Sequence, residues 1–141
     1  MWIDLKSNGR TFVWHLEWPA DICAELVSWS NPCGRITNSD LELAELVLYE
    51  AYFPYVCSAP SWNAPATGSD NTTTVSWSFR EASSVNLVVV DLLRLRSAQN
   101  WNSKITPSVF YHPGPKNTMA DDASRQFDIS DKASLSLFSS H

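Results

Sequence analysis

Apolar and polar residues alternate at the start of the chain, on both sides of a short polar segment. Residues 2–5 and 11–18 form the two alternating runs, and the sequence Ser-Asn-Gly-Arg lies between them. Alternation with a period of two is typical of half-buried strands, and an Asn-Gly pair tolerates the positive φ angles of a tight hairpin turn. Residues 1–19 are therefore predicted to form a β-hairpin.

Two longer segments have the pattern of helices. Residues 36–53 are mostly strong helix formers with apolar side chains on nearly all sides, and Pro54 follows them. Such a segment predicts a largely buried helix that ends before the proline. Residues 86–101 are amphipathic, and Asp91 and Arg94 have the i, i+3 spacing of a helical ion pair. This segment is predicted to be a helix, although its first residues, Leu-Val-Val-Val, also suit a strand.

Shorter segments complete the pattern. Residues 20–30 suit a short helix or a loop insertion, which the sequence Asn-Pro-Cys-Gly ends. Residues 56–67 predict an irregular connection into a short strand, which ends at Gly-Ser-Asp-Asn just before a stretch able to begin a helix. Residues 104–111 predict another strand, in which Pro107 indicates an edge or a bulge. Together these elements indicate a mixed α/β fold.

Composition limits the classes of function. The 141 residues suit one domain, predicted over residues 1–127 and followed by a Ser-rich tail at 128–141. The net charge of −5 argues against strong non-specific binding to nucleic acid, so any such contact must be local. Three widely spaced cysteines without a secretory signal predict reduced thiols in an intracellular protein, cytoplasmic or nuclear. No apolar run approaches the roughly 18 residues of a membrane span, so no membrane contact is expected.

Three carboxylates lie at the starts of predicted helices or at the end of a predicted strand. Glu42 is either the capping-box partner of Ser39 or a metal ligand at the start of a buried helix. Asp70 follows a strand and is either the N-cap of the next helix or a ligand. Asp121 opens a short helix after the stiff turn His-Pro-Gly-Pro, where it either favours the helix dipole or binds a cation.

Each carboxylate has a structural explanation, but the three together indicate one site. Ionised carboxylates that converge repel one another and need cations between them. Hard oxygen ligands select Mg²⁺ or Mn²⁺, and two such ions roughly 4 Å apart are the usual device for displacement at a phosphodiester. The sequence therefore predicts a site for two divalent ions if all the ligands are present.

Basic residues have a local excess in one part of the chain. If a polyanion binds, we expect it to bind there, and the alternative is a solvated helix face. The residues concerned are Arg80, Arg94, Arg96 and Lys104.

Each of the three carboxylates lies in a short motif. The motifs are T-N-S-D-L-E-L-A, from Thr37, G-S-D-N, from Gly68, and N-T-M-A-D-D-A-S-R, from Asn117. In this order they resemble the second, third and terminal acidic motifs of the ribonuclease H domain of retrotransposon reverse transcriptases. The resemblance covers roughly residues 1–127.

The resemblance implies a ribonuclease H-like fold, in which helices flank a mixed sheet, and cleavage of the RNA strand of RNA/DNA hybrids. It makes Glu42, Asp70 and Asp121 the metal ligands, and it makes His112 the counterpart of the family's loop histidine. The hybrid's phosphates are then expected to contact the basic residues named above and Asn117.

The chain also departs from the family's pattern. The family's fold begins with a strand that carries the first catalytic aspartate, whereas this chain begins at the following hairpin, so that strand and its aspartate are expected to be missing. Asp4 is a substitute if the first strand shifts to the central position. We therefore expect a weak or inactive nuclease. The alternative function is a non-catalytic module derived from a retroelement, which binds protein or nucleic acid or associates with itself through an open sheet edge.

Overall fold

The structure, a computed structural model, divides into two units. The first comprises Met1–Glu17 and Pro113–His141, and the second comprises Trp18–His112. Each unit is described by itself. The described residues are 2–5, 10–13, 16–56, 65–80 and 86–116, so the predicted boundary between domain and tail at residue 127 lies outside them.

The first unit contains the predicted hairpin. Strand β1 (Trp2–Leu5) pairs antiparallel with strand β2 (Arg10–Val13), which confirms the hairpin. The Asn-Gly turn lies outside the described residues. The second strand is shorter than predicted, because residues 16–19 have left the strand conformation and Pro19 lies directly before the first helix.

The second unit alternates helices with two short strands, so the described chain is a mixed α/β protein, as predicted. None of the described helices combines the length and the apolar character needed to cross a membrane. The elements are α1 (Ala20–Ala24), α2 (Asn38–Val56), β3 (Ala66–Ser69), α3 (Thr72–Arg80), α4 (Leu87–Ser103) and β4 (Ser108–Tyr111).

Helix α1 ends earlier than the predicted segment 20–30, because a side chain from the following loop occupies its end. The amide of Asn31 donates to the carbonyl oxygen of Ala24 at 2.9 Å and to that of Leu26 at 3.1 Å. Leu26 also forms a bridge with Ile36. The loop is therefore closed by hydrogen bonds to the backbone instead of extending the helix.

Helix α2 begins with a capping box that lies two residues before the predicted one. The Thr37 hydroxyl accepts from the Asp40 backbone N–H at 3.3 Å, and the Asp40 carboxylate accepts from the Thr37 backbone N–H at 2.7 Å. This reciprocal pattern satisfies the first backbone donors of the helix. Of the two explanations offered for Glu42, the capping box with Ser39 is wrong, since Thr37 and Asp40 already fill that role.

The other end of α2 also differs from the prediction. The helix continues through Pro54 to Val56 instead of ending before the proline. A proline removes one intrahelical hydrogen bond, here the bond to the Glu50 carbonyl one turn earlier. Because Pro54 lies in the last turn, only this one bond is lost, and the helix can still close.

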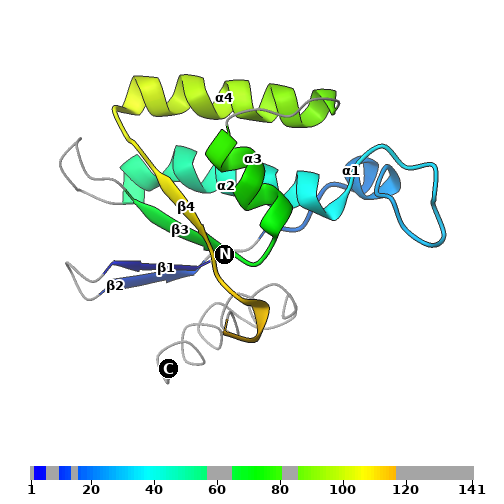
Figure 1. Ribbon diagram of the computed structural model, residues 1–141, viewed down its shortest axis with the longest axis horizontal. Coiled ribbons are helices and arrows are strands. Elements are labelled where there is room, and N and C mark those ends of the chain that lie inside the picture. Colours follow the sequence, from blue (N-terminus) through cyan, green and yellow to red (C-terminus); the bar gives the residue numbers. More distant parts are fainter. Residues whose placement is uncertain (1, 6–9, 14–15, 57–64, 81–85, 117–141) are drawn as a thin grey trace. The chain divides into compact units, whose positions relative to one another are not determined.

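Helices α2 and α4 pack side by side and run in the same direction (Figure 1). Two hydrogen-bonded pairs show this register, because Asp40 and Asn86 are 46 residues apart and so are Glu50 and Arg96. An equal offset at both places requires parallel helices in contact. The buried apolar side chains among the described residues come mainly from these two helices and are Leu43, Leu46, Val47, Tyr49, Phe53, Val89, Leu93 and Ile105.

An ion pair lies within this helix interface. Glu50 and Arg96 are 2% and 4% exposed, and the Arg96 guanidinium donates to both oxygens of the Glu50 carboxylate at 2.8–3.1 Å. Glu50, a charged residue in the middle of the predicted helix, is therefore buried and does not face solvent. The sequence does not mark the pair, because the two residues lie in separate helices.

Strands β3 and β4 form a parallel pair, in which Ala66 lies opposite Ser108 and Ser69 opposite Tyr111. Parallel neighbours require a crossover connection, which helices α3 and α4 supply here. Strand β4 begins later than predicted, after Pro107. Both strands end at the same edge of the pair, where polar residues follow each of them.

Candidate functional site

Glu42 and Asp70 come together at the carboxyl ends of β3 and β4. Ser69, the last residue of β3, donates its hydroxyl to Oε2 of Glu42 at 3.3 Å, and Asp70 follows directly. The charge of Asp70 acts on the Glu42 carboxylate. Two of the three predicted ligands, distant in sequence, are therefore neighbours at the edge where α/β sheets usually bind ligands.

Neither carboxylate has the capping role that was its structural alternative. Thr37 and Asp40 cap α2, as described above. Helix α3 is capped by Asn71, whose Oδ1 accepts from the backbone N–H groups of Thr73 at 2.9 Å and Thr74 at 3.1 Å. Asp70, one residue earlier, is exposed. Because neither carboxylate caps a helix, the explanation of Glu42 and Asp70 as ligands stays open.

Side chains from three elements hold the segment around Asp70. The Asn71 amide donates to the Ser39 hydroxyl at 2.9 Å, and the Thr74 hydroxyl donates to the Ser39 carbonyl at 3.2 Å. The Ser69 hydroxyl accepts from the Asn71 backbone N–H at 3.1 Å. These bonds join the start of α2 to the start of α3. The motifs contain Ser39 and Asn71, but the sequence did not reveal that they bind each other.

The environment of Glu42 disfavours its ionised form. Burial raises the pKa of the Glu42 carboxyl, and the negative charges of Asp70 and Glu45 raise it further. The polar side chains of Asn71 and Ser69 act in the opposite direction. A cation close to Glu42 and Asp70 would offset the repulsion between these two negative charges.

Replacing Glu42 by glutamine is expected to stabilise the metal-free protein at neutral pH. Because the folded-state pKa is raised, the ionised carboxylate destabilises the fold at pH values above that pKa, and the effect disappears at low pH, where the group is protonated in both states. Partial exposure limits the gain to less than about 1 kcal/mol. Urea unfolding with a chelator present, at pH 7 and at about pH 3, measures it.

The matched control for Glu42→Gln is Asp91→Asn. It removes one negative charge from an exposed ion pair with Arg94, 3.3 Å away. We expect Asp91→Asn to leave the stability nearly unchanged at both pH values. A loss of stability in Glu42→Gln at pH 7 would contradict this account of the site.

His112 lies at the same edge of the strand pair. Its backbone N–H donates to the Ser69 carbonyl at 2.8 Å, and its ring meets the Phe110 ring edge-to-face at a centroid distance of 6.4 Å. A Cβ atom added at Gly68 would lie only 3.0 Å from the His112 Cβ. The glycine of G-S-D-N thus allows the predicted histidine to lie close to β3.

The third predicted ligand, Asp121, lies outside the described residues, as does Asn117. The short 3₁₀ helix η1 (Gly114–Lys116) is the last described element before them. Within the part of the chain that the structure describes, no three His, Cys, Asp or Glu side chains are grouped closely enough to hold a metal ion.

One of the four residues of the predicted basic surface, Arg96, cannot contact a polyanion. Arg96 is buried, and it also donates to the Ser78 carbonyl at 3.1 Å, so it is not available to a phosphate. Arg80 and Lys104 are exposed. Arg94 is also exposed and lies 3.3 Å from Asp91, in the predicted i, i+3 pair.

Comparisons with known proteins give no relative for this chain. No protein-family model, no curated protein and no solved structure matches it. Any assignment of function therefore depends on the residues and the geometry described above.

Proposed function

We propose that this chain is a ribonuclease H-like domain, derived from a retroelement, that cleaves the RNA strand of RNA/DNA hybrids weakly and with divalent metal. The observation that supports this proposal best is the approach of Glu42 and Asp70 at the carboxyl ends of two parallel strands. The pKa of Glu42 is raised mainly by burial and also by the negative charge of Asp70, and a cation would relieve this second contribution.

The residues fit one hard cation. Mg²⁺ is often bound through one or two carboxylates, with water and substrate phosphate as its other ligands, and Glu42 and Asp70 supply the carboxylates. When bound, Mg²⁺ or Mn²⁺ supplies an activated water and stabilises the leaving oxygen. Ser69 orients the Glu42 carboxylate by donating to Oε2. A second ion would need a further ligand, for which the terminal motif offers Asp121.

The substrate class follows from the resemblance and from the exposed cations. Arg80, Arg94 and Lys104 are the basic residues of the predicted surface that remain accessible to phosphates. Two carboxylates are fewer than a two-ion site uses, so we expect slow cleavage. His112, which lies beside Gly68, would then lie near the RNA strand after its cleavage.

The first test of this function is whether the chain binds a divalent metal at Glu42 and Asp70, and the second is whether it cleaves a hybrid. Titration with Mn²⁺ is expected to broaden the NMR signals of Ser69, Asp70 and Asn71, and Asp70→Asn is expected to remove the broadening. A labelled RNA/DNA hybrid with Mg²⁺ then measures cleavage, which Asp70→Asn should lower by about 100-fold or more. The control variant Asp21→Asn, which removes an exposed carboxylate of α1 that has no role in the proposed site, should change neither result.

Two outcomes would overturn the proposal. The first is broadening that is absent or equal in the wild type and Asp70→Asn. The second is hybrid cleavage that persists in Asp70→Asn, since this would place the activity elsewhere or in a contaminant.

A non-catalytic interaction module is the second candidate, and one observation favours it. Several large aromatic side chains of the second unit are nearly fully exposed, and aromatic residues are enriched where proteins bind each other. In such a module the carboxylates are dispensable, so Asp70→Asn would leave partner binding or self-association unchanged. The exposed aromatic residues are Trp29, Tyr55, Phe79 and Trp101.

A further inference from the structure

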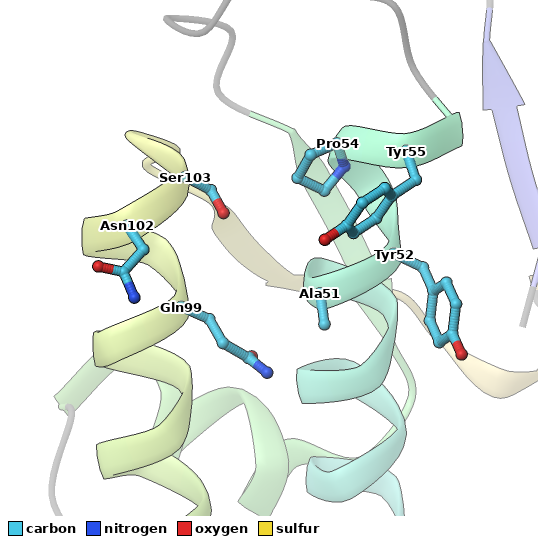
Figure 2. A pocket seen from close by; sticks show the side chains of 7 residues that line it. All are labelled: Ala51, Tyr52, Pro54, Tyr55, Gln99, Asn102 and Ser103. Atoms are coloured by element: carbon cyan, nitrogen blue, oxygen red, sulfur yellow. The ribbon is translucent and has the colours of Figure 1, made fainter.

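Two features of the second unit are open to a further molecule. A cavity of about 540 Å³ lies between the C-terminal parts of α2 and α4, where Figure 2 shows the Gln99 side chain extending from α4 towards α2. None of the residues that line this cavity is charged, so its lining does not select one class of ligand. The second feature is the outer edge of β3. It is more selective, because a row of backbone N–H and carbonyl groups is complementary to another extended strand.

The hydrogen bonds of the parallel pair show which backbone groups of β3 face outwards. The carbonyl oxygens of Pro65 and Ser69 both accept from backbone N–H groups of the β4 segment at 2.8 Å. The direction of these groups alternates along a strand, so the N–H and carbonyl groups of Ala66 and Gly68, the residues at the alternate positions, face away from β4. These two residues therefore form the outer edge of the strand pair.

The outer edge of β3 is accessible and unprotected. Ala66 and Gly68 are both exposed, and among the described residues no hydrogen bond reaches the N–H or carbonyl of either. Proteins usually protect an edge strand with a charged side chain, a proline or a bulge. The sequence of β3, Ala-Thr-Gly-Ser, contains neither charge nor proline, and its register with β4 is continuous. Another backbone can therefore approach this edge closely.

The outer edge of β3 is also complementary to itself. When two copies of the strand align antiparallel about Thr67, Ala66 of each copy lies opposite Gly68 of the other, and the N–H and carbonyl groups of both residues are paired in both copies. Thr67 then faces its counterpart at the two-fold axis, and such threonine pairs are favourable across antiparallel strands. The same alignment places the two Asp70 residues about 20 Å apart, at opposite ends of the strand pair. Their like charges are thus kept apart.

We propose that β3 pairs antiparallel with β3 of a second copy of this chain, which forms a symmetric dimer with one continuous sheet in the order β4-β3-β3-β4. A two-stranded sheet is marginally stable by itself, and the dimer removes the unprotected edge from both copies. An interface in which the same residues of both copies meet closes after two copies. The outer edge of β4 is less suitable, because its outward residue Val109 is only partly exposed.

This dimer is independent of the proposed nuclease activity. Asp70 follows the end of β3, and Asp70→Asn leaves the backbone groups of Ala66 and Gly68 unchanged. Loss of metal binding in that variant therefore leaves the dimer intact. Failure of either proposal is visible separately.

Hydrogen exchange and light scattering of the full chain, without any added partner, test the proposal. As the protein concentration rises from about 50 µM to about 1 mM, light scattering is expected to show a change from one copy to two. Over the same range, the amide protons of Ala66 and Gly68 should exchange about tenfold more slowly, because they become hydrogen-bonded. The amide protons of Val109 and Tyr111, at the other edge of the strand pair, are the internal reference and should keep the same exchange rates.

Two proline variants locate the interface. Ala66→Pro removes an outward N–H that the pairing with β4 does not use, and it is expected to keep the protein monomeric. Tyr111→Pro is the matched control, because it removes an outward N–H at the exposed end of β4, and it should dimerise like the wild type. Circular dichroism shows whether both variants fold, and the exchange rates of the wild type decide if Ala66→Pro does not.

Three results would overturn the proposal. The first is a wild type that remains monomeric over the whole concentration range. The second is a dimer in which Ala66 and Gly68 exchange as fast as in the monomer, since the copies would then associate through another surface or through the exposed aromatic residues. The third is equal association of the two folded proline variants.

Discussion

Replacing Glu50 by alanine is expected to lower the free energy of unfolding by about 3–5 kcal/mol. The carboxylate accepts three hydrogen bonds from Arg96 and a fourth from the Asn100 amide at 3.1 Å. The variant leaves a buried guanidinium without its counter-ion, and this uncompensated charge causes most of the loss. Urea unfolding followed by circular dichroism measures it.

Glu25→Ala is the matched control for this prediction. Arg35 lies 2.7 Å from Glu25, as close as Arg96 lies to Glu50, but both side chains of the first pair are substantially exposed. Arg35 lowers the pKa of Glu25 mainly through its hydrogen bond, yet water replaces the lost partner when the pair is broken. We expect a far smaller loss than in Glu50→Ala, and equal losses would show that burial does not set the effect.

A double variant separates the cost of an unpaired charge from the value of the pair. Glu50→Leu combined with Arg96→Met replaces both ions by apolar side chains of similar size, so the loss should be much smaller than in Glu50→Ala. If the double variant unfolds as readily as Glu50→Ala, the polar network itself holds α2 against α4.

The helices and the hairpin could be predicted because their signals are local. Apolar spacing defined α2 and α4, and Asn86 caps α4 by accepting from the Val88 backbone N–H at 3.0 Å. The burial of Glu50 could not be predicted, since its partner lies in another helix. The extension of α2 past Pro54 was missed, because a proline is tolerated once few backbone bonds remain to be lost.

Part of the candidate site could also be predicted. Glu42 and Asp70 were chosen because each lies at the end of an element, and parallel strands bring such ends to one edge. The sequence does not tell a cap from a ligand when both are acidic and close to a helix start. Asp40 and Asn71 make the capping bonds, and their neighbours Glu42 and Asp70 form the candidate site.

Asp40→Ala tests this division of roles and is expected to lower the free energy of unfolding by about 2–3 kcal/mol. Asp40 is 1% exposed and accepts from the Thr37 backbone N–H at 2.7 Å, from the Thr37 hydroxyl at 2.9 Å and from the Asn86 amide at 2.9 Å. The variant therefore removes the cap of α2 and its bond to the start of α4. Urea unfolding measures the loss.

The comparison that decides between the two capping boxes is Ser39→Ala. This variant removes the bond that Ser39 accepts from the Asn71 amide, which is worth about 1 kcal/mol, but leaves the Thr37–Asp40 box intact. Asp40→Ala should therefore cost more than Ser39→Ala. A larger loss of stability in Ser39→Ala than in Asp40→Ala would indicate that Ser39 and Glu42 form the capping box. Glu42 would then be a capping residue and not a candidate metal ligand.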